Sequence, residues 1–426
     1  MTAALLAFAI LLLAGMPIAV VMVMSGLAGV YTIGGWNFLA ILADQMYSGV
    51  AGYILIAIPY FIFTAELMNH AGLTEQLIRF NNALFGRVRG ALSHVNITVS
   101  LFFAGLTGAA ITDTVAIGKI LIPAMKKQGY DAAYSAAVTA SSSIIGPIIP
   151  PSIVMVVYAS ILRDVSVIDL FAAGILPGLL MTAALLAASA FLCWRRGYPR
   201  SDEPWRLSVV LRTFLPTLPA LLVPVIILGG ILSGATTVTE ASAFGAVYAL
   251  SIGALGYRTL TPAKIMDALV VTVRFSGVVF FLLAASTVLG WFVTRSGIAR
   301  EAAQMIRNVS DVPSVQILLV IALVTLLGTL LDVLPALVVS GPVLVPAMVS
   351  LGFDPLHVAT VMILTLNVAN ITPPVGMTLM TASKIANVPY ERAIIETIPF
   401  FLSHMVVIML VTFIPAIALW LPSLLH

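Results

Sequence analysis

Charged residues are scarce in this chain: they make up 9% of its 426 residues, against about 25% in an ordinary soluble domain. Hydrophobic residues make up 61%, and the mean hydropathy is +1.13. A water-soluble fold cannot bury that much apolar surface, so the composition excludes a soluble globular protein. The formal net charge is only +3, and Lys and Arg lie scattered between apolar stretches, so nucleic-acid binding has no support.

The chain also lacks the residue patterns of most enzymes. Its one cysteine, Cys193, cannot form an intrachain disulfide. It has no Gly-x-x-x-x-Gly-Lys-Ser/Thr loop to bind nucleotide phosphates, so ATP does not drive it directly. It has no His-Glu-x-x-His or nucleophile-elbow pattern, and its five histidines lack metal-ligand spacing. We therefore expect neither an enzyme nor an organic cofactor.

What the chain does have is a series of apolar stretches of roughly 20 residues, the length of a helix that crosses a bilayer core about 30 Å thick. A helix satisfies its own backbone groups in lipid. The sequence therefore predicts an all-α polytopic membrane protein surrounded by the lipid bilayer. The expected crossing segments are residues 3–32, 53–70, 131–162, 166–194, 213–233, 237–256, 267–293, 354–385 and 393–423.

The second half of the chain repeats the first. Residues 120–160 align without a gap on residues 343–383, and 13 of the 41 pairs are identical. The matched residues include Pro150-Pro151 with Pro373-Pro374, which shape the backbone. One structural unit therefore occurs twice. We assign the first repeat to residues 1–195, a cytoplasmic linker to 196–211, and the second repeat to 212–426.

Positive charge indicates that the two repeats point in opposite directions. Arg79 to Arg89 and Lys126-Lys127 mark cytoplasmic loops under the positive-inside rule. The counterpart of Lys126-Lys127 in the second repeat is the uncharged pair Val349-Ser350. An odd number of crossings between the repeats explains this difference. The resulting order places the N-terminus in the cytoplasm and the C-terminus in the periplasm.

Two amphipathic segments are expected to lie along the membrane surface. Residues 73–88 form one of them, on the cytoplasmic side. The other surrounds Arg300 and Arg307, which together with Arg295 conflict mildly with the positive-inside rule because the predicted order puts them outside.

Each repeat should contain a re-entrant hairpin and a broken helix. Residues 91–126 begin and end beside cytoplasmic charge, so they must turn back inside the membrane, and 312–348 are their counterpart. The segments 131–162 and 354–385 cross the membrane but contain proline pairs that a regular helix cannot accommodate. We expect these helices to break in mid-membrane.

Backbone groups left bare at such breaks are costly in hydrocarbon unless a ligand binds them. Carbonyl oxygens at the end of one half-helix suit sodium, and amide groups at the start of the next suit an anion. The two hairpin tips and the two breaks should therefore converge near the bilayer centre and bind ions or solute there.

Structural explanations remain open for several of these residues. Prolines can merely kink a transmembrane helix, and the serine run 141–143 can serve close helix packing. Asp113 and Asp332 can cap the returning half-helices, although a carboxylate inside the membrane is also a candidate functional group. Glu240 is expected to form a capping box with Thr237.

The chain resembles the large membrane subunit of tripartite ATP-independent periplasmic (TRAP) transporters, within the ion-transporter superfamily. The residues that carry the resemblance are Gly15-Met16-Pro17-Ile18-Ala19, Gly105-Leu106-Thr107-Gly108 with Thr112-Asp113, the run from Ser142 to Ser152, and Asn370-Ile371-Thr372-Pro373-Pro374-Val375-Gly376. The resemblance implies an elevator-type carrier, driven by Na+ ions, in the bacterial inner membrane. It also implies two partners, a small four-helix membrane subunit and a periplasmic substrate-binding protein, and an organic acid as substrate.

The expected function is secondary active transport, with sodium-coupled uptake of a small organic anion that the periplasmic binding protein delivers. The candidate sodium ligands are Thr107, Gly108, Asp113, Ser142, Ser143 and Gly146 in the first repeat, and Gly328, Thr329, Asp332, Thr365, Asn367 and Asn370 in the second. The candidate substrate contacts are Thr107, Ser142, Pro147, Thr329, Asn370 and Thr372. A carrier that works alone is the main alternative, and a channel or a membrane-embedded enzyme is favoured less.

Overall fold

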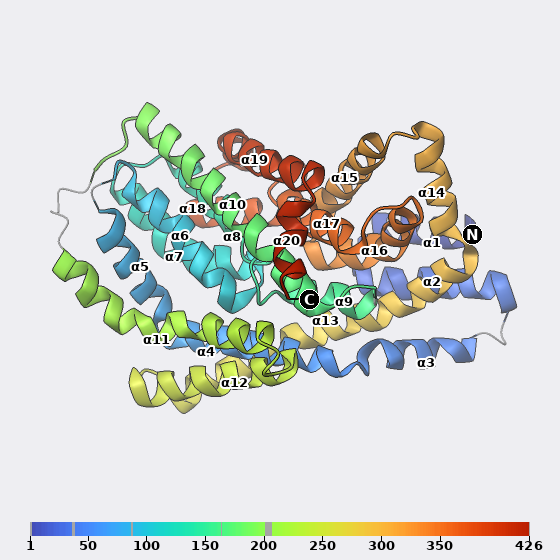
Figure 1. Ribbon diagram of the computed structural model, residues 1–426, viewed down its shortest axis with the longest axis horizontal. Coiled ribbons are helices and arrows are strands. Elements are labelled where there is room, and N and C mark those ends of the chain that lie inside the picture. Colours follow the sequence, from blue (N-terminus) through green and yellow to red (C-terminus); the bar gives the residue numbers. More distant parts are fainter. Residues whose placement is uncertain (1, 36–38, 87, 163, 201–206, 426) are drawn as a thin grey trace.

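The computed structural model describes residues 2–35, 39–86, 88–162, 164–200 and 207–425. Helices are the only regular secondary structure within these ranges (Figure 1), which confirms the all-α prediction. Eight of the described helical segments are long and apolar enough to cross a membrane. Many large apolar side chains, among them Leu13, Phe191 and Trp194, are exposed on the outside of the molecule, as expected for a protein whose solvent is lipid.

The described part of the first half supplies ten α-helices and a short 3₁₀-helix, with the following bounds. They are α1 (Thr2–Leu13), α2 (Ile18–Gly34), α3 (Leu39–Val50), η2 (Tyr53–Ile56), α4 (Ala57–His70), α5 (Leu73–Phe85), α6 (Ala91–Thr107), α7 (Ala110–Lys127), α8 (Ala132–Ser143), α9 (Ile153–Ile161) and α10 (Val167–Arg195). The amphipathic segment expected at 73–88 is α5.

The described part of the second half supplies ten more α-helices and one π-helical turn. They are α11 (Leu207–Leu232), α12 (Val238–Ser251), η3 (Ile252–Gly256), α13 (Pro262–Ser296), α14 (Ile298–Val309), α15 (Pro313–Leu330), α16 (Val333–Ser350), α17 (Pro355–Ala369), α18 (Met377–Ala386), α19 (Tyr390–Phe413) and α20 (Ala416–Ser423). Helix α11 already begins at Leu207, within the segment 196–211 that was predicted as a linker. Residues 201–206 of that segment lie outside the described ranges.

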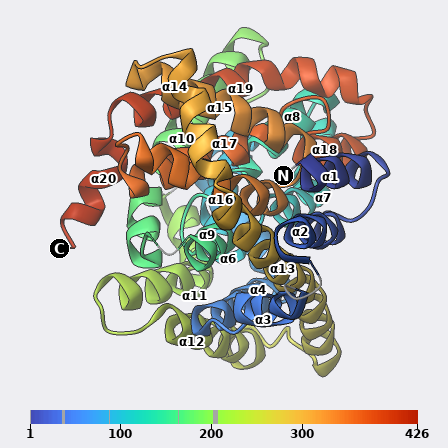
Figure 2. The same ribbon diagram turned by 90° about the vertical axis from the view of Figure 1, so that its right-hand side faces the viewer.

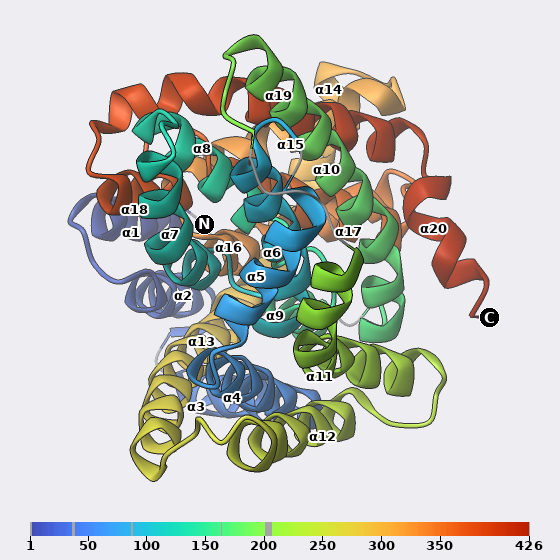
Figure 3. The ribbon, with the colours of Figure 1, turned by 90° about the vertical axis from the view of Figure 1, so that its left-hand side faces the viewer.

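The helices α3, α4 and α12 form one side of the molecule in all three views (Figures 1, 2 and 3). The long helix α13 packs against α3 and α4 of this layer, and it also contacts α2 and α16. It therefore lies between this outer layer and the helices that carry the hairpins and breaks. The N-terminus lies at the end of the molecule that carries α14, whereas α5 lies at the opposite end (Figure 1).

Two predicted continuous spans are wrong. The span 3–32 consists of α1 and α2, which pack against each other. The chain turns between them because Gly15 has a φ of +75° and Pro17 takes the N-cap position of α2, where a proline is tolerated but cannot continue the preceding helix. The span 393–423 is likewise divided at Pro415 into α19 and α20.

Both expected breaks are present in the backbone. Residues 144–152 separate α8 from α9, and residues 370–376 separate α17 from α18. The expected turns at 108–109, between α6 and α7, and at 331–332, between α15 and α16, are also present, and each helix pair packs together. The capping box of Thr237 and Glu240 at the start of α12 is confirmed, with both reciprocal hydrogen bonds formed.

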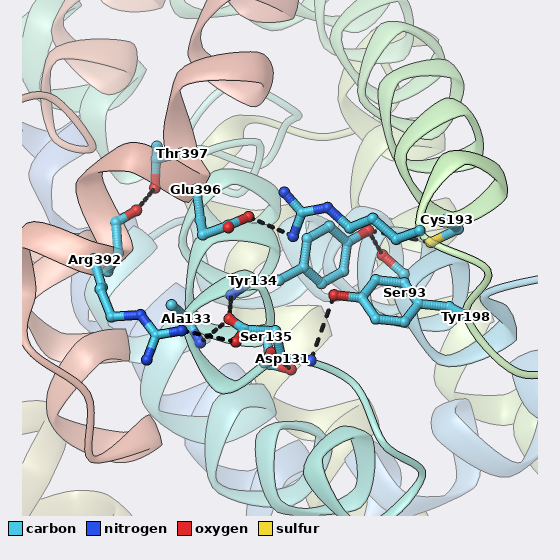
Figure 4. Close-up of polar contacts among 12 residues, drawn as sticks. Ser93, Asp131, Ala133, Tyr134, Ser135, Cys193, Tyr198, Arg392, Glu396 and Thr397 are labelled. Atoms are coloured by element: carbon cyan, nitrogen blue, oxygen red, sulfur yellow. Dashed lines mark hydrogen bonds and ion pairs between the residues drawn. The ribbon is translucent and has the colours of Figure 1, made fainter.

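A polar cluster joins the first half of the chain to α19 (Figure 4). Arg196 and Glu396 form an ion pair at 2.7 Å, and the guanidinium of Arg196 lies over the ring of Tyr134. Arg392 pairs with Asp131 at 3.3 Å. Burial lowers the pKa of Arg196, but its hydrogen bond and ion pair with Glu396 raise the pKa by more, so the guanidinium keeps its charge. The cluster thus holds α8, the end of α10 and α19 together.

Candidate functional site

A cavity of about 130 Å³ lies where the first hairpin turn, the second hairpin turn and both helix breaks approach one another. A water molecule in the liquid occupies about 30 Å³, so the cavity has room for several waters or a small solute. Its lining residues are Gly108, Ala109, Ala110, Ile111, Thr112, Pro147, Ile153, Val154, Phe275, Asp332, Val333, Leu334 and Asn370.

Three helices begin at this cavity. The first residues of α7, α9 and α16 line it: residues 110–112, 153–154 and 333–334. The first N–H groups of a helix have no partner within that helix, and they carry a partial positive charge. The N-cap residues of α7 and α16 make no side-chain capping hydrogen bond, whereas the hydroxyl of Ser152 caps α9 by accepting from the Met155 N–H. The cavity is therefore suited to a negatively charged group.

The first hairpin turn packs directly on the first helix break. Gly108 has a φ of +58°, and a Cβ atom there would lie 3.1 Å from the Ile153 backbone nitrogen and 3.2 Å from the Pro151 carbonyl oxygen. Asp113 is fully buried, and one of its carboxylate oxygens lies against Gly146 in the break. Of the predicted sodium ligands, the structure thus places Asp113 against Gly146 and places Gly108 against the far end of the same break.

Asp113 does not occupy the N-cap position of α7, which is Ala109. It lies in the first turn of that helix, and its N–H donates to the Ala109 carbonyl oxygen at 3.1 Å. Asp332 does occupy the N-cap position of α16, but its side chain makes no capping hydrogen bond.

Ser142 belongs to a hydrogen-bonded network that the sequence did not predict. Its hydroxyl donates to the Asn96 side-chain oxygen at 3.1 Å and accepts from the Ser100 hydroxyl at 2.9 Å, and both partners lie on α6. Ser143 donates to the Thr139 carbonyl oxygen within α8. The carbonyls of Ser142 and Ser143 also accept turn hydrogen bonds from Ile145 and Gly146, so the end of α8 is less bare than expected.

The second helix break presents amide oxygens instead. The Asn370 side-chain nitrogen donates to the Asp332 carboxylate at 3.0 Å, and the Asn367 side-chain nitrogen donates to the Ile363 carbonyl oxygen at 2.8 Å. These acceptors fix the orientation of both amides. Both remaining amide oxygens are buried and accept no hydrogen bond from the described residues. A buried acceptor of this kind costs free energy unless a cation or a water binds it.

The other predicted residues of the second half lie close to these groups but bond locally. The hydroxyls of Thr329 and Thr365 donate to carbonyl oxygens of their own helices, and the hydroxyl of Thr372 in the break donates to the Val368 carbonyl oxygen of α17. Gly328 packs on the end of α17, since a Cβ atom there would lie 2.6 Å from the Ala369 Cβ atom. Each hydroxyl oxygen keeps lone pairs that can accept from a solute or bind an ion.

Of the predicted substrate contacts, Pro147 and Asn370 line the cavity. Ser142, Thr329 and Thr372 are not among its described lining residues, and the side chain of Thr107 lies outside the described part of the structure. No pattern in the sequence indicated Phe275 of α13, which also lines the cavity. Phe275 looks like one of many apolar residues in a long span, and only the packing of α13 brings it to the site.

The charges at the cavity are unbalanced. Asp332 lines it, but no Lys or Arg is among its described lining residues. Within the described ranges, no three or more His, Cys, Asp or Glu side chains are grouped so that they could hold a metal ion. The carboxylate of Asp332 and the buried amide oxygen of Asn370 are hard oxygen donors of the kind that suit a cation such as sodium.

Comparison with solved structures first defines the class of fold. The structure of the Alcanivorax borkumensis YdaH transporter superposes with a TM-score of 0.65 at 14% sequence identity, and the match covers 91% of this chain and 89% of that one. The chain therefore has the fold of a multi-pass membrane transporter.

The sequence then identifies the family. The model of the DctM component of tripartite ATP-independent periplasmic transporters matches residues 5–417. The sialic acid TRAP transporter large permease protein SiaM of Vibrio cholerae is 37% identical over 419 residues, 97% of this chain and 96% of the relative. The 2,3-diketo-L-gulonate TRAP transporter large permease protein YiaN of Escherichia coli is 30% identical over 401 residues, 94% of each chain. The chain belongs to the large membrane subunits of TRAP transporters.

Membership of this family settles the broad function. The chain is a subunit of a membrane transporter and not an enzyme. A TRAP large subunit implies two partners, a small membrane subunit and a periplasmic binding protein. The expectations for the class of protein and for its partner subunits were therefore correct.

Proposed function

We propose that this chain carries a small organic anion, a carboxylate, across the bacterial inner membrane together with Na+ ions. The observation that carries the proposal is the convergence of three helix N-termini on one cavity. Such ends attract negative charge, and they do so most strongly in a site that excludes water. The periplasmic binding protein delivers the anion, and the cavity binds it between the two hairpin turns.

The names of the relatives support a carboxylate as substrate. The relative in Vibrio cholerae is named for sialic acid and the one in Escherichia coli for 2,3-diketo-L-gulonate, and both compounds carry a carboxylate. The cavity has backbone N–H groups for such a group and an apolar wall that includes Phe275.

Charge balance supports coupling to sodium. An anionic substrate would face the carboxylate of Asp332 with no described Lys or Arg in the lining to offset the repulsion. A cation that binds the buried amide oxygens of Asn367 and Asn370, or the oxygens around Asp113 and Gly146, removes that repulsion. Substrate and sodium then bind more tightly together than either does alone, which is the thermodynamic basis of coupled transport.

Matched local structures support the two-repeat arrangement. Gly129 and Gly352 both have positive φ, and the residues two further on, Asp131 and Asp354, both cap the helices that later break. In our proposal the repeats have opposite orientations, and the hairpins with the broken helices move as one body against α3, α4, α11, α12 and α13, as in an elevator.

The arrangement of helices also bears on orientation. If the end with α5 faces the cytoplasm, the N-terminus lies on the periplasmic side, because it shares the end of the molecule that carries α14 (Figure 1). The earlier expectation of a cytoplasmic N-terminus assumed that residues 3–32 cross once, whereas α1 and α2 fold back on each other. We keep the proposal of a periplasmic C-terminus.

Reconstituted transport tests the proposed function. The chain is inserted into liposomes with the small subunit and binding protein of its own transporter, and uptake of radiolabelled sialic acid and 2,3-diketo-L-gulonate is followed. An inward sodium gradient should drive accumulation of one of these acids, and an equal potassium gradient should not. Equal uptake in both gradients would refute sodium coupling, and uptake without the partner subunits would favour the stand-alone carrier.

A further inference from the structure

A second, larger cavity lies beside the end of α13. It measures about 410 Å³, and polar residues from two helices contribute to its wall: Gln45 of α3, and Thr287, Thr294 and Arg295 of α13. Trp291 and Pro342 are among its other lining residues. The proposed transport cycle does not use this space, which we call the Arg295 pocket.

The Arg295 pocket and the central cavity share three walls. Helices α9, α13 and α16 line both, the central cavity at residues 153–154, 275 and 333–334 and the Arg295 pocket at residues 161, 286–295 and 342–346. At about 1.5 Å per residue, the two lie roughly 12 Å apart along α9 and α16 and roughly 16 Å apart along α13. The two cavities therefore lie at different levels along the same three helices.

Arg295 gives the pocket a positive charge. Its guanidinium lies 5.8 Å from the centre of the Trp291 ring and forms no ion pair with the described acidic residues. The side chain is exposed, so its donors can reach a solute. A planar guanidinium on an aromatic ring is well arranged to bind a carboxylate through two hydrogen bonds.

The location of this charge also needs an explanation. In the proposed orientation Arg295 lies on the periplasmic side, where the positive-inside rule disfavours arginine close to a membrane span. The central cavity has no described cationic side chain in its lining, whereas Arg295 supplies one to the Arg295 pocket.

We propose that the Arg295 pocket is the periplasmic vestibule of the transport path, and that Arg295 binds the carboxylate of the substrate there before it enters the central cavity. This inference rests on the proposed function and adds a second substrate site to it. The hydroxyls of Thr287 and Thr294 and the amide of Gln45 suit the polar groups of a sugar acid.

Cysteine labelling tests the vestibule directly, because the one native cysteine, Cys193, is buried. Thr294→Cys places a thiol in the pocket, and Val309→Cys places a matched thiol on the exposed surface of α14, outside the pocket. The complex in liposomes is labelled with a sulfonate-bearing methanethiosulfonate reagent, with sialic acid or 2,3-diketo-L-gulonate present or absent. We expect one acid to slow labelling at position 294 by about tenfold at saturation and to leave position 309 unaffected.

The charge of Arg295 is tested in the same background. Arg295→Gln should abolish the protection of position 294, whereas Arg295→Lys should retain part of it, because a point charge still attracts an anion but loses the two-point contact. Unchanged labelling at position 294 with either acid would overturn the vestibule. Protection by the empty binding protein alone would show a docking surface for that protein, and would overturn it equally.

Uptake assays separate this inference from the function on which it rests. Arg295→Gln should raise the substrate concentration for half-maximal uptake by about tenfold, and Arg300→Gln on the surface of α14 should leave it unchanged. Sodium-dependent uptake without protection at position 294 would support the proposed function and refute the vestibule. Protection at position 294 without sodium-dependent uptake would support the anion site and refute the coupling to sodium.

Discussion

The buried amide oxygens of Asn367 and Asn370 are the most specific residue-scale feature of the site, because each amide nitrogen is bonded and each oxygen has no described donor. In a native interior such an acceptor is rare unless a water or an ion binds it. The proposed sodium ions would bind these two amide oxygens and so satisfy both buried acceptors.

Asn370→Ala should therefore weaken sodium binding. The substitution removes one proposed ligand and the hydrogen bond to Asp332. We expect the sodium concentration for half-maximal uptake to rise by about tenfold, the effect of losing one hydrogen bond or ligand to a charged group. Sodium titration of uptake in liposomes measures this.

The matched control is Asn308→Ala, which removes the same side chain from the exposed surface of α14. It should leave the sodium titration unchanged. An Asn370→Ala transporter with wild-type sodium dependence would exclude Asn370 as a ligand.

Gly108→Ala tests the close approach of the first hairpin turn to the first break. Gly108 has a φ of +58°, and an added Cβ atom would press on Pro151 and Ile153. We expect a loss of about 1–2 kcal/mol of stability from the left-handed conformation alone and a marked fall in uptake. Thermal unfolding in detergent and uptake in liposomes measure the two effects.

Gly277→Ala is the control for Gly108→Ala. Gly277 lies within α13, and a Cβ atom there would meet nothing within 4 Å. The substitution should stabilise the helix slightly and leave uptake unchanged. If both alanine variants behaved alike, the turn would not depend on a tight backbone contact.

Residue types were predictable from the sequence, but their partners were not. Proline, glycine and asparagine at the breaks stood out because a regular helix disfavours them. Ser142 donates a hydrogen bond to Asn96 and accepts one from Ser100, and both partners are more than 40 positions away in the sequence. No local pattern indicates which helix will pack there.

At the scale of elements, the helix breaks were predicted better than the first and last membrane spans of the chain. The proline pairs lie within long apolar segments, so the interruption was visible. The turn between α1 and α2 also contains a glycine and a proline, Gly15 and Pro17. The residues on both sides are apolar, however, so the sequence predicted one continuous span. Hydropathy alone cannot distinguish one crossing helix from two shorter helices that pack together.

The ion pairs to α19 should differ in strength. The side chains of Arg196 and Glu396 are 33% and 20% exposed, whereas those of Arg392 and Asp131 are 67% and 36% exposed. Exposed pairs contribute little because water and salt screen them. Double-mutant cycles with alanine should give a coupling of about 0.5–1 kcal/mol for the first pair and about 0.2 kcal/mol for the second.

Thermal unfolding of the two single and one double variant of each pair gives these coupling energies. Added salt should lower the coupling energy of the Arg196–Glu396 pair less than that of the Arg392–Asp131 pair, because the first pair is better shielded from solvent. Equal coupling energies for both pairs would contradict the view that the ion pair of Arg196 and Glu396 is the stronger link between α10 and α19.

At the scale of the whole molecule, the convergence of α7, α9 and α16 is the feature that gives the site its chemistry. The sequence predicted that two hairpin turns and two breaks would meet, and the structure places Gly108, Pro147, Asp332 and Asn370 around one cavity. It could not predict the contribution of α13, because that helix reaches the site through packing between distant segments. The position of the cavity depends on tertiary contacts that have no local signature.

The most direct test of the central claim is an experimental density map of the complete transporter with sodium and a transported acid bound. We predict density for the carboxylate at the starts of α7, α9 and α16, and density for sodium beside the amide oxygens of Asn367 and Asn370 or between Asp113 and Gly146. A map in which the acid binds elsewhere while this cavity holds only water would contradict the account.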